Sequence, residues 1–117
     1  MTDTDPTCLF CRIVAGDLPS RLAYTDENVV AFHDVNPQAP THVLIVPRRH
    51  VPDIDALTPD DGELLAALFG AVQRVAADAG FEGGYRVVSN VGPDAGQSVP
   101  HLHLHVLGGR QMGWPPG

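Results

Sequence analysis

The segment His101-Leu102-His103-Leu104-His105-Val106-Leu107 alternates histidine with apolar residues. Side chains of a β-strand point alternately to its two faces, so the three histidines share one face and the leucines and Val106 share the other. Three imidazoles in a row bury less apolar surface than three apolar side chains would, and they place titratable rings next to one another. A strand with a purely structural role has no need of such a row. The pattern therefore predicts a strand over 101–107 whose histidine face carries chemistry.

Two kinds of chemistry compete for this histidine face. Because a strand rises about 3.3 Å per residue, His101 and His103 can share a metal, whereas His101 and His105 start about 13 Å apart and meet only if the strand bends. A catalytic zinc held by all three histidines is one hypothesis. The other makes the central His103 a nucleophile toward phosphorus, with its second ring nitrogen fixed by a hydrogen bond. Backbone N–H groups of Gly92, Gly96 and Gln97 and the Ser98 hydroxyl could gather around a phosphate.

The rest of the chain predicts four further strands and two helices. The expected strands cover 21–25, 28–34, 41–47 and 85–91, and a short helix covers 9–16. A long amphipathic helix is expected from the capping sequence Thr58-Pro59-Asp60-Asp61 to a stop at Gly80. Its apolar positions recur at spacings of three and four: Leu65, Leu68, Val72, Val75 and Ala79. Hairpin-like spacing predicts one α+β domain over 1–117, with a five-stranded antiparallel sheet covered by helix and an irregular segment at 108–117.

Composition limits the classes of function. The 117 residues carry 7 basic and 14 acidic side chains, a net charge of −7, and no basic cluster larger than Arg48-Arg49-His50, so no nucleic-acid polymer is expected as a partner. No apolar run approaches the roughly 18 residues of a membrane span, and no membrane association is expected. The acidic residues 1–6 do not resemble a secretory leader, so we expect a cytoplasmic protein. At this length, dimerisation would add considerably to the core.

Residues 96–112, GQSVPHLHLHVLGGRQM, resemble the histidine triad (HIT) family, and within it the nucleotide-binding HINT branch. Residues 32–34 (FHD), 37–42 (PQAPTH) and 114–117 (WPPG) are similar to their counterparts in that branch. The resemblance implies a two-fold homodimer whose sheets join and whose segment 108–117 reaches the partner's active site. It also implies a purine nucleoside phosphoramidase, which cleaves P–N bonds in compounds such as adenosine 5′-phosphoramidate or nucleotidyl-lysine.

The resemblance assigns roles by position. His103 would be the nucleophile that takes the nucleotidyl group, His42 and His105 would line the phosphate site, and Ser98 would bond the leaving amine. Asp34 would accept the ribose hydroxyls. The other expected nucleotide contacts are Asn90, Gly96, Gln97 and Trp114, with Phe10, Ile13, Phe32, His33 and Leu44 around the base. From residue type alone, Asp34, Asn90 and Ser98 are equally typical of turns.

The only two cysteines form the pair Cys8-Leu9-Phe10-Cys11. Such a pair in a reducing compartment is more often metal-binding or redox-active than a disulfide, and no preceding strand supports a thioredoxin-like arrangement. Half of a tetrahedral zinc site is the favoured interpretation, with two buried thiols as the alternative. Cysteine-bearing members of the triad superfamily imply that His50 and His101 complete a structural zinc site, although many HINT-branch proteins lack these cysteines. No catalytic metal is then expected.

Two functions of other classes remain open at this point. One is a nucleotide-binding module that serves as a regulatory scaffold and retains the site residues. The other is the metal-dependent hydrolase that uses all three histidines of the row.

Overall fold

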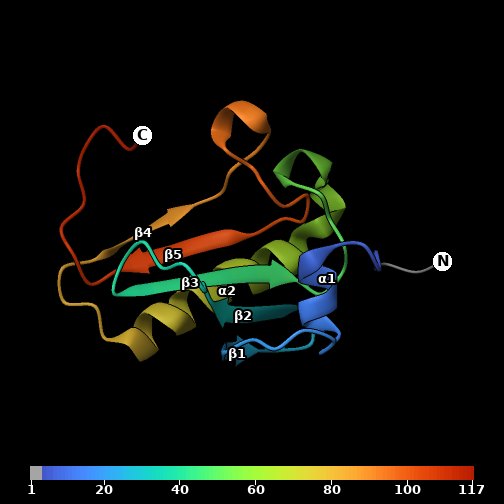
Figure 1. Cartoon of the computed structure of the whole chain (residues 1–117), viewed down its shortest axis with the longest axis horizontal. Helices are drawn as coiled ribbons and strands as arrows, with labels where there is room; N and C mark the ends of the chain where they lie inside the picture. The colour runs from blue at the N-terminus through green and yellow to red at the C-terminus, as the bar shows by residue number, and fades with distance from the viewer. Residues whose placement is uncertain (1–3) are drawn as a thin grey trace.

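The computed structural model describes residues 4–117, so residues 1–3 of the acidic start lie outside the described residues. Five antiparallel strands form one sheet in the order β1-β2-β3-β5-β4 (Figure 1). The strands are β1 (Leu22–Thr25), β2 (Val29–His33), β3 (Thr41–Pro47), β4 (Tyr85–Val88) and β5 (Leu104–Gly108), and the helices are α1 (Leu9–Val14) and α2 (Gly62–Ala79). The predicted α+β fold is confirmed. Neither of these helices has the length and hydropathy to cross a membrane.

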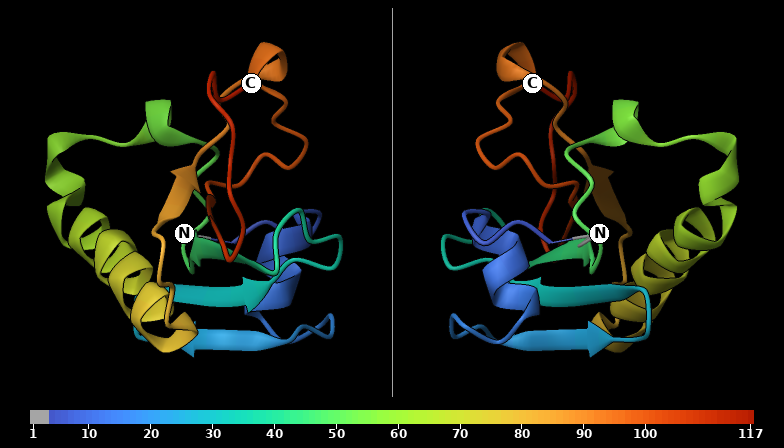
Figure 2. Two further views of the ribbon diagram at one scale, coloured as in Figure 1. Left: turned by 90° about the vertical axis from the view of Figure 1, so that its left-hand side faces the viewer. Right: turned by 90° about the vertical axis from the view of Figure 1, so that its right-hand side faces the viewer.

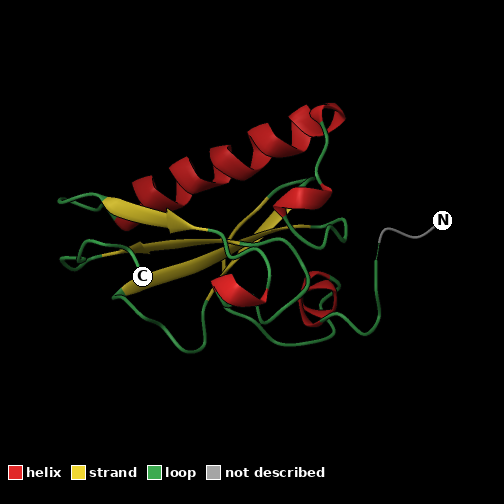
Figure 3. Ribbon diagram, turned by 90° about the horizontal axis from the view of Figure 1, so that it is seen from above, coloured by secondary structure: helices red, strands yellow, loops and turns green. Residues whose placement is uncertain are grey.

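The two helices cover opposite faces of the sheet (Figures 2 and 3). On one face, α2 packs its buried residues against a core that includes Val43, Ile45 and Val106. On the other face, Phe10 of α1 packs with Phe32 and Leu44. Strand alternation separates these two sets, so the central strands β2 and β3 each contribute to both cores.

The long helix begins later than its capping sequence predicts. Thr58 and Asp61 do form the expected capping box, but Pro59–Asp61 form a 3₁₀ turn and α2 starts at Gly62. Gly80 ends the helix in a left-handed conformation with φ of 66°, as predicted. The buried face of α2 also differs from the predicted one: Leu64 is buried in place of Leu65, and Ala79 is exposed.

The histidine segment is a strand only from Leu104 onward, so the prediction for 101–103 is wrong. Its partner strand pairs no further than Ile45 with Leu104, and β4 ends at Val88 rather than at 91. The alternation of faces nevertheless continues, because Leu102 lies in the α2 core with Leu104. Because residues 101–103 lie outside the strand ladder, the His101 carbonyl is free to accept a hydrogen bond from a side chain, that of His103.

Candidate active site and metal centre

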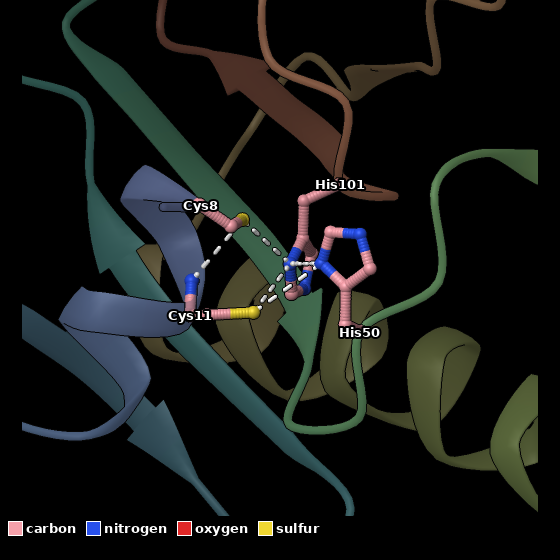
Figure 4. A group of neighbouring side chains, drawn as sticks. All are labelled: Cys8, Cys11, His50 and His101. Carbon is pink, nitrogen blue, oxygen red and sulfur yellow. Dashed lines mark hydrogen bonds between the residues drawn. The ribbon is translucent and has the colours of Figure 1, made fainter. Parts of the chain in front are cut away.

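Two cysteines and two histidines converge beneath α1 (Figure 4). Cys8 caps the N-terminus of α1 and Cys11 lies in its first turn, while His50 follows β3 and His101 precedes β5. The His101 Nδ1 atom lies 3.3 Å from Cys8 Sγ, 3.5 Å from Cys11 Sγ and 3.2 Å from His50 Nδ1. Cys11 Sγ lies 3.3 Å from His50 Nδ1. The four predicted metal ligands are therefore brought together from three distant segments.

The spacing of these four atoms fits a zinc ion. Tetrahedral zinc with Zn–N bonds of about 2.0–2.1 Å and Zn–S bonds of about 2.3 Å separates its ligands by about 3.3–3.8 Å. The four distances above fall in or just below this range. Four protein donors close such a site, which is typical of structural rather than catalytic zinc.

Hydrogen bonds around the cluster orient its nitrogen and sulfur atoms so that they can bind a cation. The His101 Nε2–H donates to the Pro47 carbonyl at 2.9 Å, which leaves a lone pair on Nδ1 facing the sulfurs. The backbone N–H of Cys11 donates to Cys8 Sγ, and that of Asp5 donates to Cys11 Sγ, each at 3.4 Å. Burial lowers the pKa of His101 to about 4, which keeps the ring neutral, and raises the pKa of the Cys11 thiol. A thiolate at Cys11 consequently needs a positive charge beside it.

His103 lies next to this centre with its tautomer fixed by the backbone. Its Nδ1 lies 2.7 Å from the His101 carbonyl oxygen, and because a carbonyl only accepts, Nδ1 carries the proton. The Nε2 atom of neutral His103 then bears a lone pair. The edge of the Phe10 ring packs against the imidazole at a centroid distance of 5.1 Å, and the side chain is 6% exposed. In the neutral ring, this arrangement gives the Nε2 lone pair a fixed direction.

His42 and His105 form a second hydrogen-bonded pair on the same face. The Gln38 backbone N–H donates to His42 Nδ1 at 3.1 Å, so the neutral ring carries its proton on Nε2. That Nε2–H lies 2.8 Å from His105 Nδ1, which accepts it, and the proton of neutral His105 is therefore on Nε2. Burial, and then His103 and His42, lower the pKa of His105 to about 4. Burial also lowers the pKa of His42 despite Asp34 at 3.5 Å.

These tautomers argue against a metal held by the row of histidines. Both ring nitrogens of His101 are engaged, one by Pro47 and one by the cysteine cluster, so His101 cannot join His103 and His105 around a second ion. Asp34, His42 and His105 also lie close enough to form a ligand set. In that set, His42 Nε2 bears a proton rather than a lone pair, so the geometry disfavours a metal there.

The loop before β5 uses its polar groups internally. The Gln97 side chain accepts from the Gly92 N–H and donates to the Pro52 and Val99 carbonyls. The Gly96 and Gln97 N–H groups donate to the Pro93 and Gly92 carbonyls. They are therefore hydrogen-bonded within the loop, whereas the sequence led us to expect them around a phosphate. The Asn90 amide donates to the Ala95 carbonyl. Asn90 and Gln97 thus act as turn residues in this conformation, while Ser98 is exposed.

The residues expected around a base divide between the two faces of the sheet. Phe10, Phe32 and Leu44 are buried in one core on the histidine face, and Ile13 packs against them. His33 pairs with Val43 across β2 and β3, which places its ring on the α2 face. There it lines a cavity of about 350 Å³ with Val75 and Asp78. Strand alternation therefore turns the His33 ring away from Phe32, and its role at the base stays a prediction of the resemblance.

Asp34 and Trp114 are the remaining residues that are expected to contact the nucleotide. Asp34 accepts a hydrogen bond from the Asn36 N–H at 2.8 Å, as a turn residue does, and its other oxygen faces His42. Trp114 is 82% exposed, and residues 109–117 contain no helix or strand, whereas Gly108, predicted to be irregular with them, is the last residue of β5. Sequence reasoning missed the Gln38 N–H and the Pro47 carbonyl, because backbone groups leave no mark on residue type.

The HIT domain profile matches residues 15–112 of the chain. A crystal structure of a HIT family hydrolase from Legionella pneumophila is 49% identical with a TM-score of 0.92, covering 95% of this chain and 100% of that one. A HIT family hydrolase from Clostridium thermocellum is 44% identical with a TM-score of 0.91, covering 94% and 96%. The 14 kDa zinc-binding protein of Zea mays is 49% identical over 98% of this chain and 91% of its own. The chain belongs to the HIT family.

Proposed function

We propose that this HIT-family protein is a hydrolase that cleaves the P–N bond of purine nucleoside 5′-phosphoramidates through a nucleotidyl-histidine intermediate. The observation that carries the proposal is the 2.7 Å hydrogen bond from His103 Nδ1 to the His101 carbonyl, which leaves Nε2 of His103 free to attack. The family membership and its similarity to HIT-family hydrolases support hydrolysis as the class of reaction.

In the first step, the His103 Nε2 lone pair forms a bond to phosphorus while the P–N bond to the amine breaks. The departing nitrogen takes a proton from solvent, relayed through the exposed Ser98 hydroxyl, and leaves as the free amine. Positive charge develops on the nucleotidyl imidazole, and the Nδ1–H···O=C bond to His101 strengthens with it. The backbone carbonyl thus favours the transition state over the ground state.

In the second step, water attacks phosphorus on the side opposite His103 and the P–Nε2 bond breaks. The products are the nucleoside monophosphate and a neutral His103, and the proton of the attacking water returns to solvent, which balances the proton taken up in the first step. His105 stays neutral through both steps, because burial lowers the pKa of its imidazolium form to about 4, and we propose that its Nε2–H donates a hydrogen bond to a phosphate oxygen. Asp34, which faces His42, is proposed to accept the ribose hydroxyls, with Phe10, Ile13, Phe32 and Leu44 nearest the base.

We also propose that the Cys8, Cys11, His50 and His101 cluster holds a structural zinc. The donor set and its spacing support this, as does the similarity to a zinc-binding protein of maize. A bound ion neutralises the thiolates and crosslinks α1 to the segments that precede β5 and follow β3.

The homodimer is the third part of the proposal. Strand β4 is an edge of the sheet with exposed Tyr85 and Val87, and Trp114 is exposed beyond it. These features support pairing of two copies along β4, with segment 108–117 of each reaching the site of the other.

Intact-protein mass spectrometry after brief exposure to adenosine 5′-phosphoramidate tests the proposed reaction. The wild type is expected to gain one adenylyl group, and His103→Ala is expected to gain none. An equal adduct on His103→Ala would assign the nucleophile elsewhere. Turnover that stops at once on chelation, with no adduct in either protein, would favour metal-dependent hydrolysis.

A further inference from the structure

The segment that follows β5 is tied to the loop between β2 and β3. Arg110 Nε–H donates to the Gln38 carbonyl at 2.9 Å, across 72 positions of sequence. Gly109, with φ of 94°, lies against the Pro40 ring so closely that an added Cβ would be 3.0 Å from a ring carbon. Two consecutive residues after β5 therefore contact this loop.

The same loop determines which nitrogen of His42 carries the proton. The Gln38 N–H donates to His42 Nδ1, and His42 Nε2–H in turn faces His105 Nδ1. Gln38 thus receives a hydrogen bond from Arg110 through its carbonyl and gives one to His42 through its N–H. Most of the loop is exposed, with Ala39 as its buried member, so its position relies on such contacts.

We propose that Arg110 is a positioning residue for the His42–His105 pair and acts through the Gln38 backbone. When Arg110 holds Gln38 in place, the Gln38 N–H stays aimed at His42 Nδ1 and one tautomer of both rings is enforced. When this contact is lost, His42 can place its proton on either nitrogen and His105 loses its fixed donor. The segment 108–117 is in this way connected to the site of its own chain. The effect on catalysis rests on the proposed function, whereas the effect on the tautomer does not.

Arg86 provides a matched control. Its guanidinium Nη2 donates to the Gly113 carbonyl at 2.8 Å, so it also anchors the C-terminal segment, but no hydrogen bond links it to Gln38. Arg86→Ala removes one guanidinium hydrogen bond of this segment, to Gly113, and Arg110→Ala removes two, to Gln38 and to Gln111. Only Arg110→Ala removes the contact to the β2–β3 loop.

Long-range ¹H–¹⁵N spectra of the imidazole nitrogens test the proposal directly. The wild type and Arg86→Ala are expected to show His42 with a pyridine-type Nδ1 and a protonated Nε2. Arg110→Ala is expected to move both nitrogens toward averaged shifts, and to lower kcat about 3- to 10-fold, the loss of one hydrogen bond, with KM nearly unchanged. An unchanged His42 in Arg110→Ala, or an equal change in Arg86→Ala, would overturn the proposal. If the His42 shifts change but the wild type does not hydrolyse phosphoramidates, the proposed function fails and this inference stands.

Discussion

The two polar clusters on the histidine face contain the same kind of residue and differ in which ring nitrogen is free. In the cysteine cluster, the Pro47 carbonyl takes the proton of His101 Nε2 and turns a lone pair toward the sulfurs. In the other cluster, the Gln38 N–H occupies His42 Nδ1 and puts a proton where a metal would bind. One backbone hydrogen bond to each ring thus separates a metal centre from a hydrogen-bonded pair of histidines.

The largest expected effect concerns His103. His103→Ala is expected to lower kcat for adenosine 5′-phosphoramidate by at least about 1000-fold, because the covalent route is lost. His33→Ala is the matched control, since this ring lies on the α2 face, and it is expected to leave turnover within about 2-fold. Steady-state kinetics of both variants measure this difference. Comparable losses of kcat in the two would mean that the face of the sheet on which a histidine lies does not determine its part in catalysis.

Loss of the metal is expected to lower the free energy of unfolding and to have no immediate effect on turnover. Cys11→Ser, which removes one ligand, is expected to lower the free energy of unfolding by about 3 kcal/mol or more, as urea titration with and without zinc can measure. His42→Gln, in the other cluster, is expected to cost about 1 kcal/mol. Brief exposure of the zinc-loaded protein to a chelator should leave turnover unchanged at first. Stability independent of zinc would refute a structural role.

Acid is expected to destabilise the protein through His105. The pKa of this ring is lowered from 6.5 to about 4 in the folded protein, mainly by burial. Between these two values the unfolded chain binds a proton that the folded protein does not, so the free energy of unfolding falls as pH falls through this window, by at most about 3 kcal/mol. Replacing the ring by Asn should flatten the profile measured by urea titration from pH 7 to pH 4. A profile as steep in His105→Asn as in the wild type would assign the effect to other groups.

The smallest expected effect is at Ser98. Because its hydroxyl is exposed and is proposed only to assist the departing amine, Ser98→Ala is expected to lower kcat by about 10-fold or less, and more for poor amine leaving groups than for good ones. Kinetics with a series of amines of differing basicity would show this trend. Equal losses across the series would remove Ser98 from leaving-group chemistry.

Side-chain patterns predicted the sheet, both helices and the grouping of Cys8, Cys11, His50 and His101, the last with the help of a family resemblance. Alternation along β2 places His33 on the α2 face, whereas its role at the base comes from the resemblance alone and stays a prediction. The early end of the β5 ladder was not predictable in the same way, since it depends on where β3 and β4 stop pairing. Nor were the tautomers, because the backbone groups of Pro47, Gln38 and His101 that fix them are common to every residue type.

The central claim is that these backbone groups determine what each histidine can do, and ¹⁵N spectra of the imidazoles in the zinc-loaded protein test it most directly. His103 is expected to carry its proton on Nδ1 with Nε2 free, and His42 and His105 are expected to show the reverse arrangement. His101 should carry its proton on Nε2 with Nδ1 shifted by the metal. If His103 instead carries its proton on Nε2 at neutral pH, that nitrogen has no lone pair with which to attack phosphorus. This result would contradict the central claim.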